Sequence, residues 1–194
     1  TDGLVDPPQY FPKNAVMNRM GYESIDTVLQ KGVIGLDAKQ FMDIVARDEA
    51  LILDTREKEE FMDGFIPGSI WIGIDNNFAP WVGALISDLD QSIVFLATNG
   101  REEEVVTRLA RVGYDNALGY LEGGIETWKK DGREVDTIEH IPSGEFNRLY
   151  EGKKLNLLDV RKTSEYQAQH IVGAENFPLD FINRNMSQVD KKKT

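Results

Sequence analysis

Two pairs of oppositely charged residues stand at equivalent places in this chain of 194 residues, Asp54 with Arg56 and Asp159 with Arg161. A carboxylate next to a guanidinium could act as a general base or help to bind an anion. We interpret both pairs instead as structural ion pairs that brace a loop, because networks of this kind are often structural. Carboxylates that could join them stand at matching positions, Glu60 and Glu165.

The other residues that could do chemistry form no recognisable site. The two histidines, His140 and His170, stand far apart in the sequence and lack the spacing of a metal site. The chain has no cysteine, which excludes thiol chemistry and disulfides within it. Gly123 and Gly124 lack the full Gly-x-Gly-x-x-Gly pattern, so we interpret them as a tight strand-to-helix turn. We therefore expect no metal and no cofactor in this chain.

Composition and charge narrow the classes of partner. The formal net charge is −11, which disfavours nucleic acid and anionic membranes, because binding to their phosphates needs clustered Lys and Arg. A hydrophobic content of 41% and a charged content of 28% are ordinary for a globular protein. No apolar run approaches the ~20 residues of a membrane helix. We expect a cytoplasmic protein.

The sequence repeats itself once, at an offset of 105 positions. Leu53–Arg56 returns as Leu158–Arg161, and Ile66 returns as Ile171. Other matches pair Glu60 with Glu165, Gly68 with Gly173 and Asp75 with Asp180. A fixed offset with matched apolar and turn positions indicates a duplicated structural unit.

The repeat predicts one complete domain over residues 36–134 and the N-terminal half of a second over 138–194. Residues 1–35 are predicted to be a lead-in or linker with one short helix that Ser24 could cap. A half domain lacks the strands and helices that would cover its sheet edge and apolar faces. We expect it to pack against the first domain, to exchange between two chains, or to be poorly ordered.

Hydrophobic patterning predicts helices and strands in alternation. Predicted strands of the first copy lie at 51–53, 70–72, 93–96 and 117–120, and those of the second at 155–158 and 174–179. A helix over 102–111 follows the short loop after the strand 93–96. Strands that alternate with helices through short loops indicate an α/β fold with a mainly parallel sheet, covered on both faces.

These motifs resemble the rhodanese family of sulfurtransferase-type domains. The resemblance is carried by the repeated Leu53–Arg56 motif, by Gly64–Ser69 with its echo His170–Ala174, and by Leu121–Gly124 with Trp128. It implies a rhodanese-like three-layer fold with a mainly parallel central sheet, in one complete domain plus a truncated second copy.

The resemblance also identifies a reactive loop. In active members of the family, a cysteine ends the fourth strand and opens a tight loop whose backbone N–H groups face it, which lowers the thiol pKa. In this chain Ala97 stands at that place. The degenerate loop comprises Ala97, Thr98, Asn99, Gly100, Arg101 and Glu102. A methyl group cannot be a nucleophile, so the resemblance implies no catalytic residue in the first domain.

The charges around this loop support that interpretation. Glu102–Glu104 complement the dipole of their own helix and would repel anionic substrates such as thiosulfate. Arg101 could face an anion, but we favour an ordinary salt bridge to a neighbouring acid.

A finer resemblance is to fusion proteins that join a metallo-β-lactamase-fold domain, of the hydrolase superfamily, to rhodanese units. Its motifs include Tyr10–Asn14, Arg111–Asp115 and Gly119–Gly124. The resemblance implies that residues 1–35 follow a metal-binding domain, which would hold Fe or Zn. None of that domain's clustered His and Asp ligands stands in this chain.

Three functions follow as hypotheses. The first is an inactive rhodanese-like module, a pseudoenzyme domain whose partners are the other domains of its parent chain or a second copy in a homodimer. The second is a fragment of an active sulfurtransferase or persulfide dioxygenase whose cysteine lies beyond residue 194. The third is a regulatory domain that senses an anion at the loop.

Overall fold

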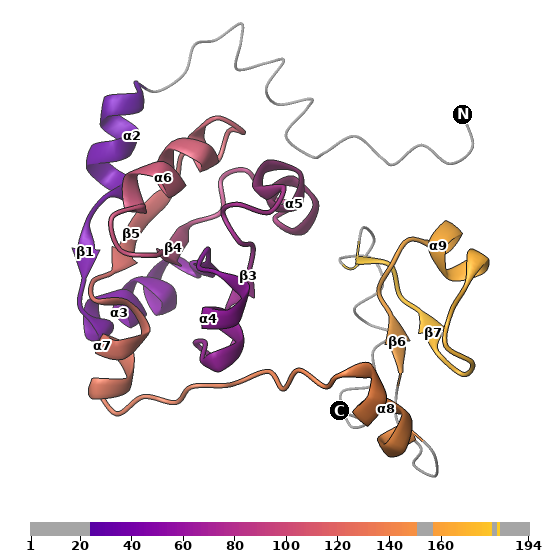
Figure 1. Cartoon of the computed structure of the whole chain (residues 1–194). Helices are drawn as coiled ribbons and strands as arrows, with labels where there is room; N and C mark the ends of the chain where they lie inside the picture. Colours follow the sequence, from indigo (N-terminus) through magenta and orange to yellow (C-terminus); the bar gives the residue numbers. More distant parts are fainter. Residues whose placement is uncertain (1–23, 151–156, 180–181, 183–194) are drawn as a thin grey trace, which may run out of the picture. The chain divides into compact units, whose positions relative to one another are not determined.

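The computed structural model describes residues 24–150, 157–179 and 182, which fall into two compact units on either side of Glu139 and His140 (Figure 1). The first unit begins with helix α2, Ile25–Gly32. Ser24 caps it by accepting a hydrogen bond from the Thr27 backbone N–H, as the sequence predicted. The predicted lead-in before residue 24 lies outside the described residues.

The first unit is built on a sheet of five parallel strands in the order β1-β5-β4-β2-β3. The strands are β1 (Gly35–Leu36), β2 (Leu51–Asp54), β3 (Ile70–Trp71), β4 (Ile93–Leu96) and β5 (Ala117–Leu121). The helices that follow α2 are α3 (Ala38–Asp48), α4 (Lys58–Asp63), α5 (Phe78–Leu85), α6 (Glu102–Ala110) and α7 (Gly124–Lys130). This order confirms the predicted α/β fold with a mainly parallel sheet.

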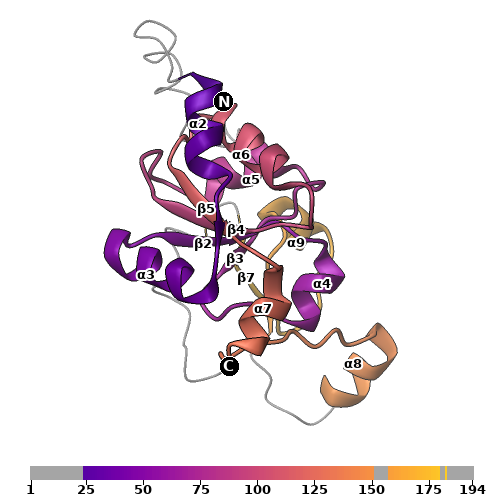
Figure 2. The same ribbon diagram turned by 90° about the vertical axis from the view of Figure 1, so that its left-hand side faces the viewer.

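The helices cover both faces of the sheet, so the unit has three layers (Figure 2). One core cluster joins the sheet to α2, α5 and α6, and the other joins it to α3 and α7. The central strand β4 contributes side chains to both clusters. Ile93 and Phe95 belong to the first cluster, and Val94 and Leu96 belong to the second. Side chains alternate across a strand, so a strand buried on both faces must be apolar throughout.

The second unit repeats the first half of the first. It contains α8 (Ser143–Tyr150), β6 (Leu158–Asp159), α9 (Thr163–Ala168) and β7 (Glu175–Asn176). Leu158 pairs with Glu175 in the parallel ladder, just as Leu53 pairs with Ile70 in the first unit. Each residue of the second pair lies 105 positions after its counterpart in the first, so the offset seen in the sequence is kept in the pairing of the strands.

The two copies differ most in burial. In the first unit β4 lies against β2, and Ile66 is only 1% exposed. Within the described residues no strand takes the place of β4 beside β6, and the equivalent Ile171 is 49% exposed. A cavity of about 500 Å³ opens there, lined by residues of 157–161 and 169–174. β7 is shorter than the strand predicted over 174–179, because pairing on one side leaves less ladder to extend it. Residues 155 and 156 of the other predicted strand lie outside the described residues.

We predict that Ile66→Ala destabilises the first unit by about 2–5 kcal/mol, because it removes a fully buried side chain and leaves a cavity. Urea denaturation followed by tryptophan fluorescence measures this, since all three tryptophans lie in the first unit. The matched control is Ile34→Ala at a 45% exposed position of the same unit, for which we expect little change. Equal shifts of the two midpoints would contradict the burial assigned to Ile66.

Candidate functional site

The loop Ala97–Arg101 leaves the carboxyl end of β4, the central strand of the sheet. Open α/β sheets bind their ligands at this edge. The first residues of the loop are held by Thr55 at the end of β2. Its backbone N–H and its hydroxyl donate to the Leu96 carbonyl, at 2.9 and 2.8 Å. The start of the loop is therefore fixed by the neighbouring strand.

The loop is a tight turn without a thiol. The Arg101 N–H donates to the Thr98 carbonyl at 3.0 Å, and Gly100 has a φ of +86°, which glycine adopts without strain. Ala97 is half-buried and packs against the core cluster that contains Phe95. The place where the family resemblance puts a thiol thus holds a methyl group.

Arg101 is held by two carboxylates. Its Nη1 and Nη2 lie 2.5 and 2.8 Å from the two carboxylate oxygens of Asp75, a bidentate arrangement, and its Nε donates to Glu104 at 2.8 Å. These hydrogen bonds lower the pKa of Asp75 to about 2, against the opposing effect of desolvation. The same partners raise the pKa of Arg101 further above its usual range.

Arg108 lies one turn after Glu104 in α6 and extends the network. Its Nη2 lies 2.5 Å from Glu104, and its Nη1 donates to the Ile74 carbonyl at 2.7 Å. Hydrogen bonds from Arg101 and Arg108 lower the pKa of Glu104. Together the two arginines tie the segment after β3 to the start of α6.

Asp54 and Arg56 form the buried ion pair of the first unit. Their side chains are 0% and 4% exposed, and Arg56 donates to both oxygens of Asp54 and to the Gly64 carbonyl at 2.8 Å. The pair links the end of β2 to the end of α4 through these hydrogen bonds.

The second unit repeats this brace at the surface. Arg161 donates to Asp159 and to the Gln169 carbonyl, at the positions equivalent to the three residues of the first unit. The Arg161 side chain is 48% exposed, and its hydrogen bonds lower the pKa of Asp159.

Glu60 and Glu165 accept hydrogen bonds at the starts of their own helices, and the charge of Glu165 also acts on Arg161. Glu60 accepts from the Glu57 N–H at 3.3 Å and from the Thr98 hydroxyl at 3.4 Å. Glu165 accepts from the Lys162 N–H at 3.2 Å. Each glutamate lies one turn into its short helix, and such a carboxylate reaches back to the free N–H at the helix start.

Gly123 and Gly124 form the turn between β5 and α7, with φ values of +73° and +61°. A Cβ on Gly123 would lie 2.3 Å from the Thr127 hydroxyl. The backbone favours glycine at both positions, and close packing adds to this at Gly123 alone.

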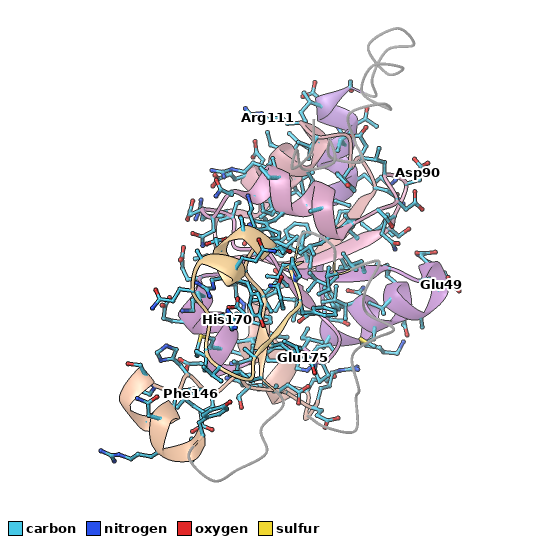
Figure 3. The ribbon with its side chains drawn as sticks, turned by 90° about the vertical axis from the view of Figure 1, so that its right-hand side faces the viewer. Glu49, Asp90, Arg111, Phe146, His170 and Glu175 are labelled. Atoms are coloured by element: carbon cyan, nitrogen blue, oxygen red, sulfur yellow. The ribbon has the colours of Figure 1, made fainter. Side chains whose placement is uncertain are left out.

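The histidines show no ligand geometry. His170, labelled in Figure 3, belongs to the second unit. Its ring stacks on that of Tyr166, with centroids 3.9 Å apart, and its Nδ1 lies 2.8 Å from the Tyr166 carbonyl. His140 is exposed. Within residues 24–150, 157–179 and 182, no three His, Cys, Asp or Glu side chains are grouped to hold a metal ion.

The model of the rhodanese-like domain family matches residues 37–131 and, separately, 143–194. The chain belongs to the rhodanese-like domain family. The first match contains the whole loop with Ala97, and the second coincides with the repeated half.

Curated relatives share only part of this chain. A tRNA uridine(34) hydroxylase of Streptococcus thermophilus is 34% identical over 100 residues, which are 50% of this chain and 30% of that protein. The chain thus spans about a third of the length of this relative.

Solved structures show distant likeness. A thiosulfate sulfurtransferase from Pseudomonas aeruginosa is 19% identical, with a TM-score of 0.45 over 93% of this chain and 38% of that one. The rhodanese-like domain of the Alr3790 protein from Anabaena is 20% identical, with a TM-score of 0.43 over 48% of this chain and 98% of that one.

Sequence reasoning missed Asp75, Thr55 and Arg108 as parts of the loop's surroundings. A signal existed for Asp75, since it recurs at the repeat offset as Asp180. No sequence pattern joins Arg108 to the Ile74 carbonyl, because that contact arises only when α6 packs beside the segment after β3.

We predict that the Asp75 carboxyl titrates with a midpoint near pH 2. Carbon-detected NMR of the side chain as a function of pH measures this midpoint. The folded-state pKa lies below the ~3.9 of an unfolded aspartate, so the ion pair adds stability above about pH 4 and loses it as the pH falls through about 2. Arg101→Gln should return the midpoint towards 3.8.

The control for this titration is Arg111→Gln, which removes the same charge from an exposed position at the end of α6. We expect the Asp75 midpoint to stay near 2 in that variant. A native midpoint close to 3.8 would show that Arg101 does not pair with Asp75.

Proposed function

We propose that this chain is a catalytically inactive rhodanese-like module that serves as a scaffold or interaction domain in a larger sulfur-handling protein. The observation that carries the proposal is Ala97 in the loop at the end of β4, inside an otherwise complete domain. A rhodanese reaction needs a thiolate that accepts and passes on sulfur, and the chain has no cysteine.

The wider context is also a proposal. We infer that residues 1–35 link a metallo-β-lactamase-fold domain, which would hold Fe or Zn, to a cysteine-less domain over 36–134 and half of a second domain over 138–194. The two separate family matches support two copies. The motif at Gly119–Gly124 forms the end of β5 and its turn, whereas the one at Tyr10–Asn14 lies outside the described residues.

The partners we propose are the other domains of the parent chain, with a homodimer as the second possibility. The net charge of −11 supports a protein that avoids nucleic acid and anionic membranes, and we propose a cytoplasmic location. Within the described residues, no helix is both long enough and apolar enough to cross a membrane.

A second candidate is that the parent is an active sulfurtransferase or persulfide dioxygenase whose reactive cysteine lies beyond residue 194. The Asp159–Arg161 brace supports it, because this brace copies the hydrogen bonds that fix the end of β2 in the first unit. In the first unit the same brace lies beside the strand from which the loop starts, and this likeness is what supports the second candidate. The anion-sensor hypothesis has less support, since Arg101 is already paired with Asp75 and Glu104.

The proposal is tested by measuring thiosulfate:cyanide sulfurtransferase activity of the chain. We expect thiocyanate formation no faster than in a protein-free blank, with an active thiosulfate sulfurtransferase as the positive control. Turnover that rises with the concentration of the chain would refute an inactive module. Turnover in the parent polypeptide but not in this chain would favour the second candidate.

A further inference from the structure

Three groups of the loop that could bind an anion already donate to carboxylates of the protein. The Gly100 N–H donates to Glu102 Oε1 at 3.1 Å. The Thr98 hydroxyl lies 3.4 Å from Glu60 Oε2. The Arg101 guanidinium holds Asp75 by two hydrogen bonds. These carboxylates come from α4, from the segment after β3 and from α6. The fold therefore brings together carboxylates that lie far apart in the sequence.

Glu102 differs from the glutamate that follows it. It is half-buried, and its side chain turns back to the amide two residues earlier. Glu103 is exposed, and within the described residues its side chain makes no hydrogen bond or ion pair. The two residues carry the same charge in the same helical turn. Comparing variants of the two therefore distinguishes the effect of the Gly100 contact from a general effect of charge.

We propose that Glu102 is an internal ligand of the loop Ala97–Arg101. Its carboxylate accepts the hydrogen bond of the Gly100 amide in place of an external anion, and the Asp75 carboxylate pairs with Arg101 in the same way. Backbone N–H groups in tight turns before a helix bind anions, and a bound carboxylate satisfies them. The inference rests on the proposed function in one respect, that no chemistry takes place at the loop. It adds that a thiol at position 97 would not by itself restore a reactive site.

The test uses Ala97→Cys, because the native chain has no cysteine and this variant contains a single thiol. The rate of alkylation by iodoacetamide as a function of pH gives the thiol pKa. The charged groups around the loop are Glu57, Glu60, Asp75, Arg101, Glu102, Glu104 and Arg108. With Glu102 in place, we expect a pKa at or above the ~8.5 of a free cysteine.

Adding Glu102→Gln removes the negative charge that faces the Gly100 amide, although the Gln oxygen can still accept a hydrogen bond. The loop and the start of α6 can then stabilise the thiolate better. We expect the thiol pKa to fall by about one unit, which is a tenfold larger thiolate fraction near neutral pH. The matched control is Ala97→Cys with Glu103→Gln, in which the same charge is lost from an exposed side chain. We expect a much smaller fall there, because water screens that charge.

A thiol pKa well below 8.5 in Ala97→Cys alone, or equal falls with Glu102→Gln and Glu103→Gln, would overturn the inference. A second measurement needs no cysteine. In the native chain the Gly100 amide chemical shift should follow the titration of a carboxyl group, and this dependence should vanish in Glu102→Gln but persist in Glu103→Gln. A Gly100 amide that is insensitive to pH in the native chain would also overturn it.

These outcomes are separate from those of the activity assay. Sulfur transfer by the native chain would refute the proposed function whatever the titration shows. An inactive chain with a failed titration would leave the proposed function standing and remove only the role of Glu102.

Discussion

The buried ion pair of Asp54 and Arg56 is the constraint on which the surroundings of the loop depend. Two charges removed from water are destabilising unless their hydrogen bonds are complete. Here Arg56 donates to both oxygens of Asp54 and to the Gly64 carbonyl, so the pair joins β2 to α4. The end of β2 is thereby fixed, and from it Thr55 holds the Leu96 carbonyl at the start of the loop. These hydrogen bonds thus hold the strand end from which a loop without cysteine starts.

The same brace in the second unit shows what the rest of the fold contributes. Asp159 and Arg161 keep the hydrogen-bond geometry, but the Arg161 side chain is 48% exposed against 4% for Arg56. Among the described residues of the second unit, the local motif therefore forms its ion pair with no strand equivalent to β4 beside it. In the first unit, β4 lies against β2 and the pair is buried. Exposed ion pairs contribute little to stability because water and salt screen them. The brace can become a strong constraint only in a complete domain.

Much of the fold could be predicted from the sequence, because the strands, helices and repeat depend on local patterns of apolar and polar residues. The apolar run at residues 93–96 indicated a strand buried on both faces, and the offset of 105 positions indicated a second copy with the same register. The strand order and the partners of Arg101 could not be predicted, since they depend on which segments the fold brings together. Glu60 illustrates the limit: its charge suggested a partner for Arg56, but its place in α4 directs it to the helix start and to Thr98.

The central claim is that the loop after β4 is closed to anions by the protein's own carboxylates and therefore takes no part in sulfur chemistry. Its most direct test is to titrate the isotope-labelled native chain with thiosulfate and to follow the backbone amides of Gly100 and Arg101 by NMR. The account predicts no saturable change beyond that produced by an equal ionic strength of chloride. A saturable shift confined to the loop amides would contradict it and would make the loop a binding site for anions.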